Sequence, residues 1–457
     1  MKIRIWASAG VAAALVLLSA CSNGAGGNEA TTGGSTPTES TESTEASAAP
    51  SEDVTLSYWA TNQGQSIDDD VRILTPELQK FEEQTGIHVD LQVVPWSDLL
   101  NNQLASAASG QGPDVSNLGN TNATSLQATG AWYPFDDAAF EAIGGKDKFV
   151  ASALGTAGPA GKPPTSVPLY SQVYALYYNK QMFADAGLQP PTTWEEMVAA
   201  AKVLTKPDQG IWGITMPAGT VNVSMHLAYI TTSQNGGSPF TADGSPDFVN
   251  DAMIKGIQRY VDLMGVDKVM NPSDAQYTDG GGPANTDFAT GKAAMYFQQT
   301  GGTNALKQIG MTQDQFGIVP IPAPEGGDKT GDSFVTGTNI SIFKNTKHPE
   351  EALQFVKFMT SPEEQEILNK AYGTLPVVKD VPASAYADFP DKLKAWSDIL
   401  ANNARPLSLV PTVSAFQTNV GGAVVSLFQQ AATGSAPTEA DVKAALEAAQ
   451  EKMAATN

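Results

Sequence analysis

The sequence predicts an α/β fold with mainly parallel sheets, divided into two lobes. Strand-like and helix-like patterns alternate along the chain from about residue 53, which is typical of α/β architecture. About four hundred residues follow that point, enough for two separate hydrophobic cores. No later apolar run approaches the roughly 18 residues that a membrane span requires.

The first elements are predicted in the order strand, helix, strand, helix and short strand. Apolar residues alternate in the strands and recur at helical spacing in the helices. Gly86 ends the first helix as a C′ residue, and Ser97 is the expected cap of the second. These elements are residues 54–58, 71–84, 87–93, 97–107 and a strand near Val115.

Two later helices carry a complete start signal. Residues 193–196 (TWEE) and 361–364 (SPEE) both fit the capping box, in which the hydroxyl and the carboxylate each satisfy a free backbone N–H. An amphipathic pattern over residues 442–453 predicts the last helix.

The only cysteine, Cys21, follows a segment with the layout of a secretory signal peptide. Lys2 and Arg4 precede an apolar run that is too short for a permanent span, and small residues stand just before the cysteine. This arrangement resembles a bacterial lipobox, which implies removal of residues 1–20 and lipidation of Cys21. The alternative is an ordinary secreted protein with a chance cysteine.

Residues 21–52 are predicted to form a disordered tether behind the lipid. They are rich in Ser, Thr, Gly, Ala and Glu and have no apolar periodicity, so they cannot bury enough surface to fold. The chain also carries a net charge of −22. That sign disfavours binding to nucleic acid or to an anionic membrane surface, and it indicates a solvated acidic exterior.

Several motifs in collinear order give the chain a family resemblance. They are residues 110–115 (GQGPDV), 177–180 (YYNK), 186–188 (AGL), 190–196 (PPTTWEE), 288–295 (FATGKAAM), 316–322 (FGIVPIP) and 338–342 (TNISI). Together they resemble the extracellular solute-binding proteins of carbohydrate ABC importers, in the family 1 that includes maltose-binding protein. The resemblance runs from about residue 54 to the C-terminus.

This resemblance implies a type II periplasmic-binding-protein-like fold. Each lobe is then a sheet flanked by helices, with a hinge between the lobes. The implied first lobe comprises residues 53–169 plus 298–344, and the second comprises 170–297 plus 345–457.

The resemblance also implies a ligand site in loops that face the cleft between the lobes. Most of the residues carried over are amides, hydroxyls or aromatics able to contact a hydroxyl-rich ligand. They are Asn62, Gln63, Gln65, Asn120, Asn122, Tyr170, Trp212, His226, Asn235, Gln298, Thr336, Gly337 and Arg405.

The sequence departs from the family at two aromatic positions. The tryptophan expected soon after Met295 is replaced by a polar run beginning Gln298-Gln299, and the one expected near Phe416 is replaced by Gln417. Aromatic faces suit the C–H faces of sugars, so these changes weaken the case for maltodextrins in particular.

Enzyme and metal chemistry find little support in the sequence. Fragments resembling a penicillin-binding serine enzyme stand in the wrong order, because Ser341-Ile342-Phe343-Lys344 comes last and in a strand pattern. The three histidines are far apart, and there is no cysteine pair. The sequence leaves open a glycosidase, because two catalytic carboxylates that are distant in the sequence can lie close together in the fold.

The function predicted is that of a monomeric, lipid-anchored receptor without cofactor or metal. It captures a sugar or oligosaccharide by hinge closure outside the cytoplasm and delivers it to the permease subunits of an ABC transporter. The alternatives are a receptor of the same fold for a peptide, a polyamine or an organic acid, a receptor that signals without transport, and a surface glycosidase.

Overall fold

The structure is a computed structural model that describes residues 54–64, 66–159, 161–278, 281–381 and 390–454. The predicted signal peptide, Cys21 and the tether of residues 21–52 therefore lie outside the described residues, as does Gln65. No helix in the described ranges is both long and apolar enough to cross a bilayer.

The first five elements confirm the predicted order. Ser66 caps α1 by accepting a hydrogen bond from the Asp69 amide, and Gly86 ends the helix with φ 74°. The second helix differs at its start, because it follows Pro95 and Ser97 makes no cap hydrogen bond. The elements are β1 (Thr55–Thr61), α1 (Ile67–Thr85), β2 (His88–Val94), α2 (Trp96–Ser109) and β3 (Val115–Gly119).

Short elements connect β3 to the first long strand. They cover one end of the first core with residues such as Phe140 and Phe149. They are η1 (Asn120–Asn122), α3 (Ala123–Ala128), α4 (Asp137–Ala142), η2 (Lys146–Lys148) and α5 (Ala151–Leu154).

Two long antiparallel strands, β4 (Val167–Asn179) and β8 (Ser333–Ile342), connect the two halves of the sheet. The strand order is β2-β1-β3-β8-β4-β6-β5, with β7 paired to β4 and β9 to β8. Pairing is parallel between β1 and its neighbours and between β5 and β6, but antiparallel wherever β4 takes part. The prediction of mainly parallel sheets is thus wrong at the centre, because the chain passes between the halves in opposite directions.

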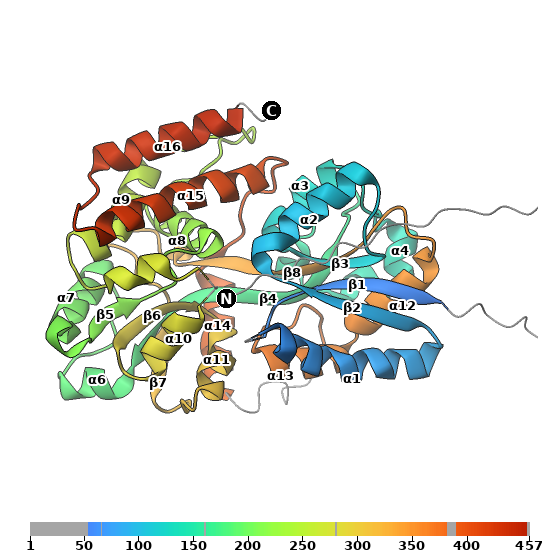
Figure 1. Cartoon of the computed structure of the whole chain (residues 1–457), viewed down its shortest axis with the longest axis horizontal. Coiled ribbons are helices and arrows are strands. Elements are labelled where there is room, and N and C mark those ends of the chain that lie inside the picture. The colour runs from blue at the N-terminus through green and yellow to red at the C-terminus, as the bar shows by residue number, and fades with distance from the viewer. Residues whose placement is uncertain (1–53, 65, 160, 279–280, 382–389, 455–457) are drawn as a thin grey trace, which may run out of the picture. The chain divides into compact units, whose positions relative to one another are not determined.

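The second half of the sheet supports a separate and larger core. Buried residues of α7, α8, α9, α15 and α16 meet there, and Figure 1 shows these helices around β5 and β6. The elements are α6 (Lys180–Asp185), α7 (Trp194–Leu204), η3 (Pro207–Gln209), β5 (Trp212–Thr215), α8 (Val221–Gln234), α9 (Asp251–Gly265), η4 (Pro272–Gln276), α10 (Gly282–Ala289), β6 (Ala293–Gln299), α11 (Gly302–Gln308), β7 (Phe316–Val319), η5 (Lys329–Gly331), α14 (Pro390–Asn402), β9 (Ala404–Arg405), α15 (Val413–Ala432) and α16 (Glu439–Ala454).

Both predicted capping boxes form only in part. Thr193 and Ser361 accept from the amides of Glu196 and Glu364 as expected. The Glu196 carboxylate, however, accepts from the amide and hydroxyl of Thr192. The Glu364 carboxylate pairs instead with Lys80 at 2.7 Å, and this ion pair ties the start of the 362–372 helix to α1.

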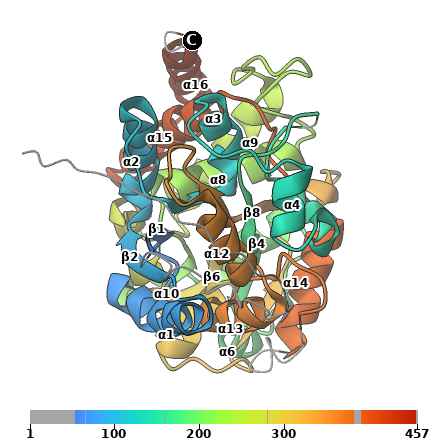
Figure 2. The ribbon, with the colours of Figure 1, turned by 90° about the vertical axis from the view of Figure 1, so that its right-hand side faces the viewer.

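Residues 345–457 are predicted for the second lobe, yet two helices among them pack in the first core. They are α12 (Pro349–Met359) and α13 (Pro362–Tyr372), whose buried faces join residues of β1 and α1. Figure 2 shows α12 near β8, which it contacts. Conversely, α11 and β7 pack with β4 and β6 around Tyr177. The predicted division is therefore wrong for residues 302–319 and 349–372, because sequence order does not say which core a helix covers.

Replacing Phe355 on α12 with alanine tests this packing. Phe355 is fully buried, and its ring meets Tyr58 and Phe81 edge-on at centroid distances of 5.0 and 5.2 Å. We expect Phe355→Ala to lower the free energy of unfolding by about 3–5 kcal/mol, measured by urea denaturation. Phe358→Ala, at a half-buried position of the same helix, is the matched control. Equal losses in the two variants would contradict the packing described.

Candidate ligand-binding site between the two cores

A cavity of about 410 Å³ lies where the two halves of the fold meet. That volume is within the range of small-molecule sites. Its walls come from the β1–α1 loop, η1 and α2 on one side, from the first turns of α8 and from α10, α11 and α15 on the other, and from β4, β6 and β8 between them.

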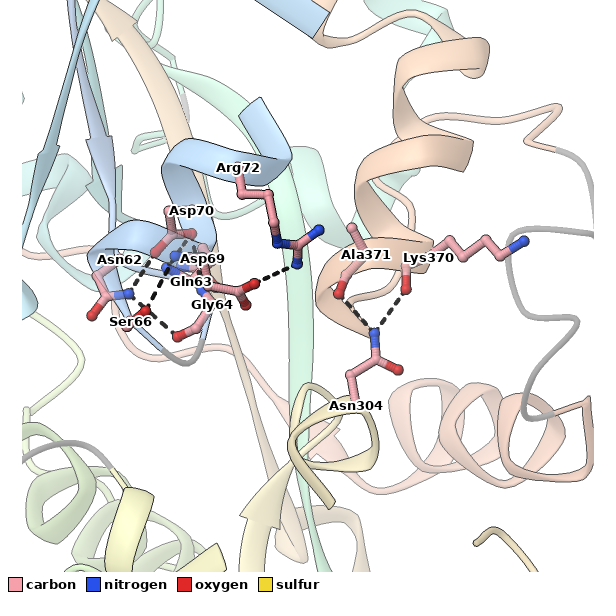
Figure 3. Close-up of polar contacts among 10 residues, drawn as sticks. All are labelled: Asn62, Gln63, Gly64, Ser66, Asp69, Asp70, Arg72, Asn304, Lys370 and Ala371. Carbon is pink, nitrogen blue, oxygen red and sulfur yellow. Dashed lines mark hydrogen bonds and ion pairs between the residues drawn. The ribbon is translucent and has the colours of Figure 1, made fainter. Parts of the chain in front are cut away.

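The β1–α1 loop contributes Asn62, Gln63 and Gly64. The Gln63 amide group donates to the hydroxyls of Thr61 at 3.1 Å and Thr338 at 2.9 Å, which fixes the loop against β8. Figure 3 shows this loop packed over the first turn of α1. The predicted residues Asn62 and Gln63 thus lie at the cavity.

The η1 turn, which directly follows β3, places three consecutive polar side chains at the cavity. Asn120 donates to the carbonyl of Val335 at 3.3 Å, which holds the turn against β8. Thr121 donates to Gln417 at 3.0 Å, and Asn122 accepts from Ser414 at 2.9 Å. Both of these last partners belong to α15, so η1 contacts the second core directly.

The strands that connect the halves form the floor of the cavity. Gln172 and Tyr174 come from β4, and the predicted residues Thr336 and Gly337 come from β8. A Cβ atom at Gly337 would lie 2.2 Å from the carbonyl oxygen of Tyr170, so the close approach of the two strands requires glycine there. The amide of Gln299 donates to Thr336 at 3.0 Å, joining β6 to the floor.

Two predicted residues of the second core also line the cavity. Gln298 donates to Asn285 at 3.1 Å and to the Tyr296 hydroxyl at 2.6 Å, so its amide has a fixed orientation. His226 lies beside Tyr174, with 3.0 Å between Nδ1 and the tyrosine hydroxyl. Burial lowers the pKa of His226 to about 3, so its imidazole is neutral at physiological pH.

Four predicted residues lie away from the cavity, and each has another partner. Tyr170 is buried beside Tyr372, at a ring distance of 5.4 Å. Trp212 begins β5 and bonds through its amide to Lys292 at 2.8 Å. Arg405 pairs with Asp328 at 2.6 Å.

Asn235 is the fourth, and helix geometry explains its place. It follows the last residue of α8 and donates to the carbonyl of Ala252, whereas the cavity meets the first turns of that helix. Asn235 lies nine positions after His226, which corresponds to about 13.5 Å along the helix axis.

Other residues lining the cavity were missed by the sequence prediction. Most are amides, small residues or aromatics on helix ends and strands whose approach depends on the fold. They include Trp96, Leu99, Leu100, Thr121, Gln172, Tyr174, Thr220, Asn222, Val223, Asn285, Gln299, Thr338, Tyr372 and Gln417. The sequence did carry a signal for Gln299 and Gln417, which stand near positions where the family resemblance calls for tryptophan.

The described residues that line the cavity include no acidic or basic amino acid other than His226. It combines amides and hydroxyls with an apolar part formed by Trp96, Leu99, Leu100 and Val223. Among the described residues that line it there is no Asp, Glu, Lys or Arg. Nor does any group of three or more His, Cys, Asp or Glu in the described ranges have a metal-binding arrangement. This surface offers many neutral hydrogen-bonding groups together with an apolar area of similar extent.

Comparison with known proteins identifies the class of this fold and site. The family model described as bacterial extracellular solute-binding protein matches residues 65–366. A solute-binding protein of Agrobacterium radiobacter K84 solved with ribitol has a TM-score of 0.74 at 24% identity, over 88% of this chain and 99% of that one. The chain therefore has the two-lobed fold of such receptors, and it belongs to the bacterial extracellular solute-binding protein family.

Two relatives have names that state what they bind. The multiple sugar-binding protein of Streptococcus mutans is 26% identical over 346 residues, which are 74% of this chain and 78% of the relative. The diacetylchitobiose binding protein of Streptomyces coelicolor is 24% identical over 381 residues, which are 82% of each chain.

The neutral state of His226 predicts part of the acid sensitivity of the fold. Its pKa is lower in the folded chain, at about 3, than its ordinary value of 6.5, so the unfolded chain binds the proton first. The contribution of neutral His226 to stability is complete above about pH 6.5 and is lost as the pH falls toward about 3. His226→Gln should therefore lose less stability on acidification than the wild type, measured by urea denaturation across this interval.

Thr418→Ala, which changes an exposed side chain that does not titrate, provides the control for this experiment and should keep the pH dependence of the wild type. If His226→Gln and the wild type lost stability equally, the buried neutral histidine would be refuted.

Proposed function

We propose that this protein captures a neutral sugar or short oligosaccharide in the cavity and delivers it unchanged to an ABC permease. The observation that carries the proposal is the lining itself, which has many amides and hydroxyls and no charged side chain among its described residues. Sugars present hydroxyls in several directions and apolar C–H faces between them. Amides satisfy the hydroxyls, and Trp96 offers an aromatic surface for a C–H face.

The same lining disfavours the charged alternatives. A polyamine, an organic acid or a peptide terminus would lose its hydration on entering the cavity and would need an opposite charge there. Arg405, which would favour a carboxylate if it faced the ligand, pairs with Asp328 outside the cavity. A glycosidase would need two carboxylates at the ligand, and no carboxylate is found among the described lining residues.

The names of the relatives agree with this ligand class. Proteins similar to this chain are named for multiple sugars and for diacetylchitobiose, and a solved structure of the same fold holds ribitol. These ligands are neutral and rich in hydroxyl groups. We extend that class to this chain because its own cavity has matching chemistry.

Closure of the two halves around the ligand follows from where the binding groups stand. Asn62 and Asn120 belong to the first core, whereas Asn222 and Gln417 belong to helices of the second. A ligand that contacts both sets stabilises the closed state over any open one. The permease then distinguishes loaded receptors by the relative position of the halves.

Attachment to the outside of the cell membrane completes the proposal. The family is extracellular. The lipobox-like sequence before Cys21 supports a lipid anchor, and the polar residues 22–52 would give the receptor reach. The protein acts as a monomer in this scheme, with the permease subunits as its partners.

A thermal-shift screen tests the ligand class. The full chain is mixed with neutral mono- and oligosaccharides and polyols, and in parallel with polyamines, peptides and organic acids. A ligand that binds only the folded state raises the melting temperature, and about 100-fold excess over Kd contributes about 2.7 kcal/mol. We expect shifts only with neutral sugars or polyols, recovered unchanged by chromatography. A shift only with charged compounds, or conversion of the sugar, would refute the proposal.

Replacing Gln417 tests closure. Its side chain accepts from Thr121 of the first core and donates to Asn222 of α8 at 2.7 Å, so it connects the two halves beside the ligand. We expect Gln417→Ala to weaken binding of the sugar found in the screen by about three- to tenfold, because about 1 kcal/mol of hydrogen bonding is lost. Isothermal titration calorimetry measures this change. Thr418→Ala, exposed on the same helix, should bind like the wild type.

A further inference from the structure

Asp70 lies directly behind Asn62, Gln63 and Gly64 of the β1–α1 loop, but it does not itself line the cavity. It belongs to the first turn of α1 and is 0% exposed. Figure 3 shows its carboxylate beside Asn62, Gln63 and Gly64. No Lys or Arg in the described ranges forms an ion pair with it. A buried carboxylate without a cationic partner is unusual and calls for a specific role.

All the described hydrogen-bonding partners of the Asp70 carboxylate line the cavity. Its oxygens accept from the Asn62 side-chain amide at 2.5 Å, the Gln63 backbone amide at 3.1 Å and the Gly64 backbone amide at 2.9 Å. Tyr372, at the end of α13, is a fourth hydrogen-bonding partner of the carboxylate. One carboxylate therefore holds both the β1–α1 loop and Tyr372 of α13, and both contribute to the wall of the cavity.

Helix capping does not explain this arrangement. Ser66 already caps α1 through the Asp69 amide at 3.1 Å. Burial raises the pKa of Asp70, so the ionised side chain makes the fold less stable at neutral pH than the protonated one would. The hydrogen bonds from the loop offset part of that cost. A residue kept at some expense of stability points to function.

The chemistry of a carboxylate also fixes the orientation of Asn62. An ionised carboxylate only accepts hydrogen bonds, so Asn62 must turn its NH₂ group toward Asp70. That nitrogen also donates to the carbonyl of Gly64 at 3.3 Å. No described residue donates to the Oδ1 atom of Asn62. The amide thus presents an acceptor to a hydroxyl in the cavity.

From this geometry we infer that Asp70 is a positioning residue that holds the β1–α1 loop and makes Asn62 a hydrogen-bond acceptor for the ligand. The inference rests on the proposed function for the ligand class. In an Asp70→Asn variant one of the two carboxylate oxygens becomes an NH₂ group, so the new amide can accept from the backbone amides of Gln63 and Gly64 only by facing its NH₂ group toward Asn62. The Asn62 amide would then turn over, and the loop backbone would keep only a neutral acceptor, which makes a weaker hydrogen bond than a carboxylate.

The experiment compares the full chain with Asp70→Asn and Asp68→Asn. Asp68 is exposed in the same helical turn, so its variant has the same charge change without the contacts. Hydrogen exchange of ligand-free protein reports the loop, and calorimetry with maltose, ribitol and N,N′-diacetylchitobiose reports binding. For Asp70→Asn we expect faster exchange at Gln63 and Gly64 and at least a tenfold rise in Kd, with a melting temperature close to that of the control.

The outcomes separate this inference from the proposed function. Unchanged exchange and Kd in Asp70→Asn would overturn it, and so would faster exchange with an unchanged Kd. If none of the three sugars bound the wild type and the wider screen also failed, the proposed ligand class would fall. The exchange data alone would then decide whether Asp70 holds the loop.

Should Asp70→Asn not fold, the wild type provides a second measurement. The amide resonances of Gln63, Gly64 and the Asn62 side chain should move together as Asp70 titrates, with a midpoint above its ordinary pKa of 3.8. The other ionisable groups facing Asp70 are Tyr58, Tyr170 and Tyr372, whose pKa values burial raises, so they stay neutral in this range. Resonances that moved independently of one another would overturn the inference.

Discussion

The antiparallel pairing of β4 with β8 is the constraint on which the rest of the structure depends. Both strands extend from one core toward the other, and the Ser333 hydroxyl bonds to the amide and the carbonyl of Tyr174 at 2.9 and 2.8 Å. These two strands form the junction between the cores. The loops of both cores that line the cavity therefore meet over this pair of strands. Part of this pairing forms the floor of the cavity, which is why Gln172, Thr336 and Thr338 line it although all three are buried.

The polar groups of the cavity are largely held by one another. Gln298 bonds to Asn285, Gln299 to Thr336, and Gln63 to Thr338. Each of these hydrogen bonds uses part of the hydrogen-bonding capacity of an amide side chain. It also fixes the direction in which the remaining donor or acceptor of that amide points. Because groups fixed in advance lose less conformational entropy on binding, this arrangement favours affinity and specificity for hydroxyl patterns that match it.

The charged side chains of the described residues lie outside the lining of the cavity, so they contribute to solubility and not to contacts with a ligand. The chain has a net charge of −22, yet the described lining residues include no charged side chain. The carboxylate of Asp70, which lies behind the β1–α1 loop, has its oxygens occupied by donors of that loop. Acidic groups therefore keep the exterior hydrated, while the ligand meets neutral dipoles. Such a site suits a hydroxyl-rich solute, whose own groups are dipoles.

The sequence by itself determined the local elements, the family and part of the binding wall. Alternation and caps fixed β1, α1 and β2 to within a few residues, and collinear motifs indicated the loops that hold Asn62 and Asn120. Only the tertiary structure decided which core α12 and α13 cover, and that Arg405 turns to Asp328. It alone brought Asp70 and Tyr372 to the site. Local patterns reflect contacts between near neighbours in the chain, whereas these placements depend on contacts between residues that lie far apart in the sequence.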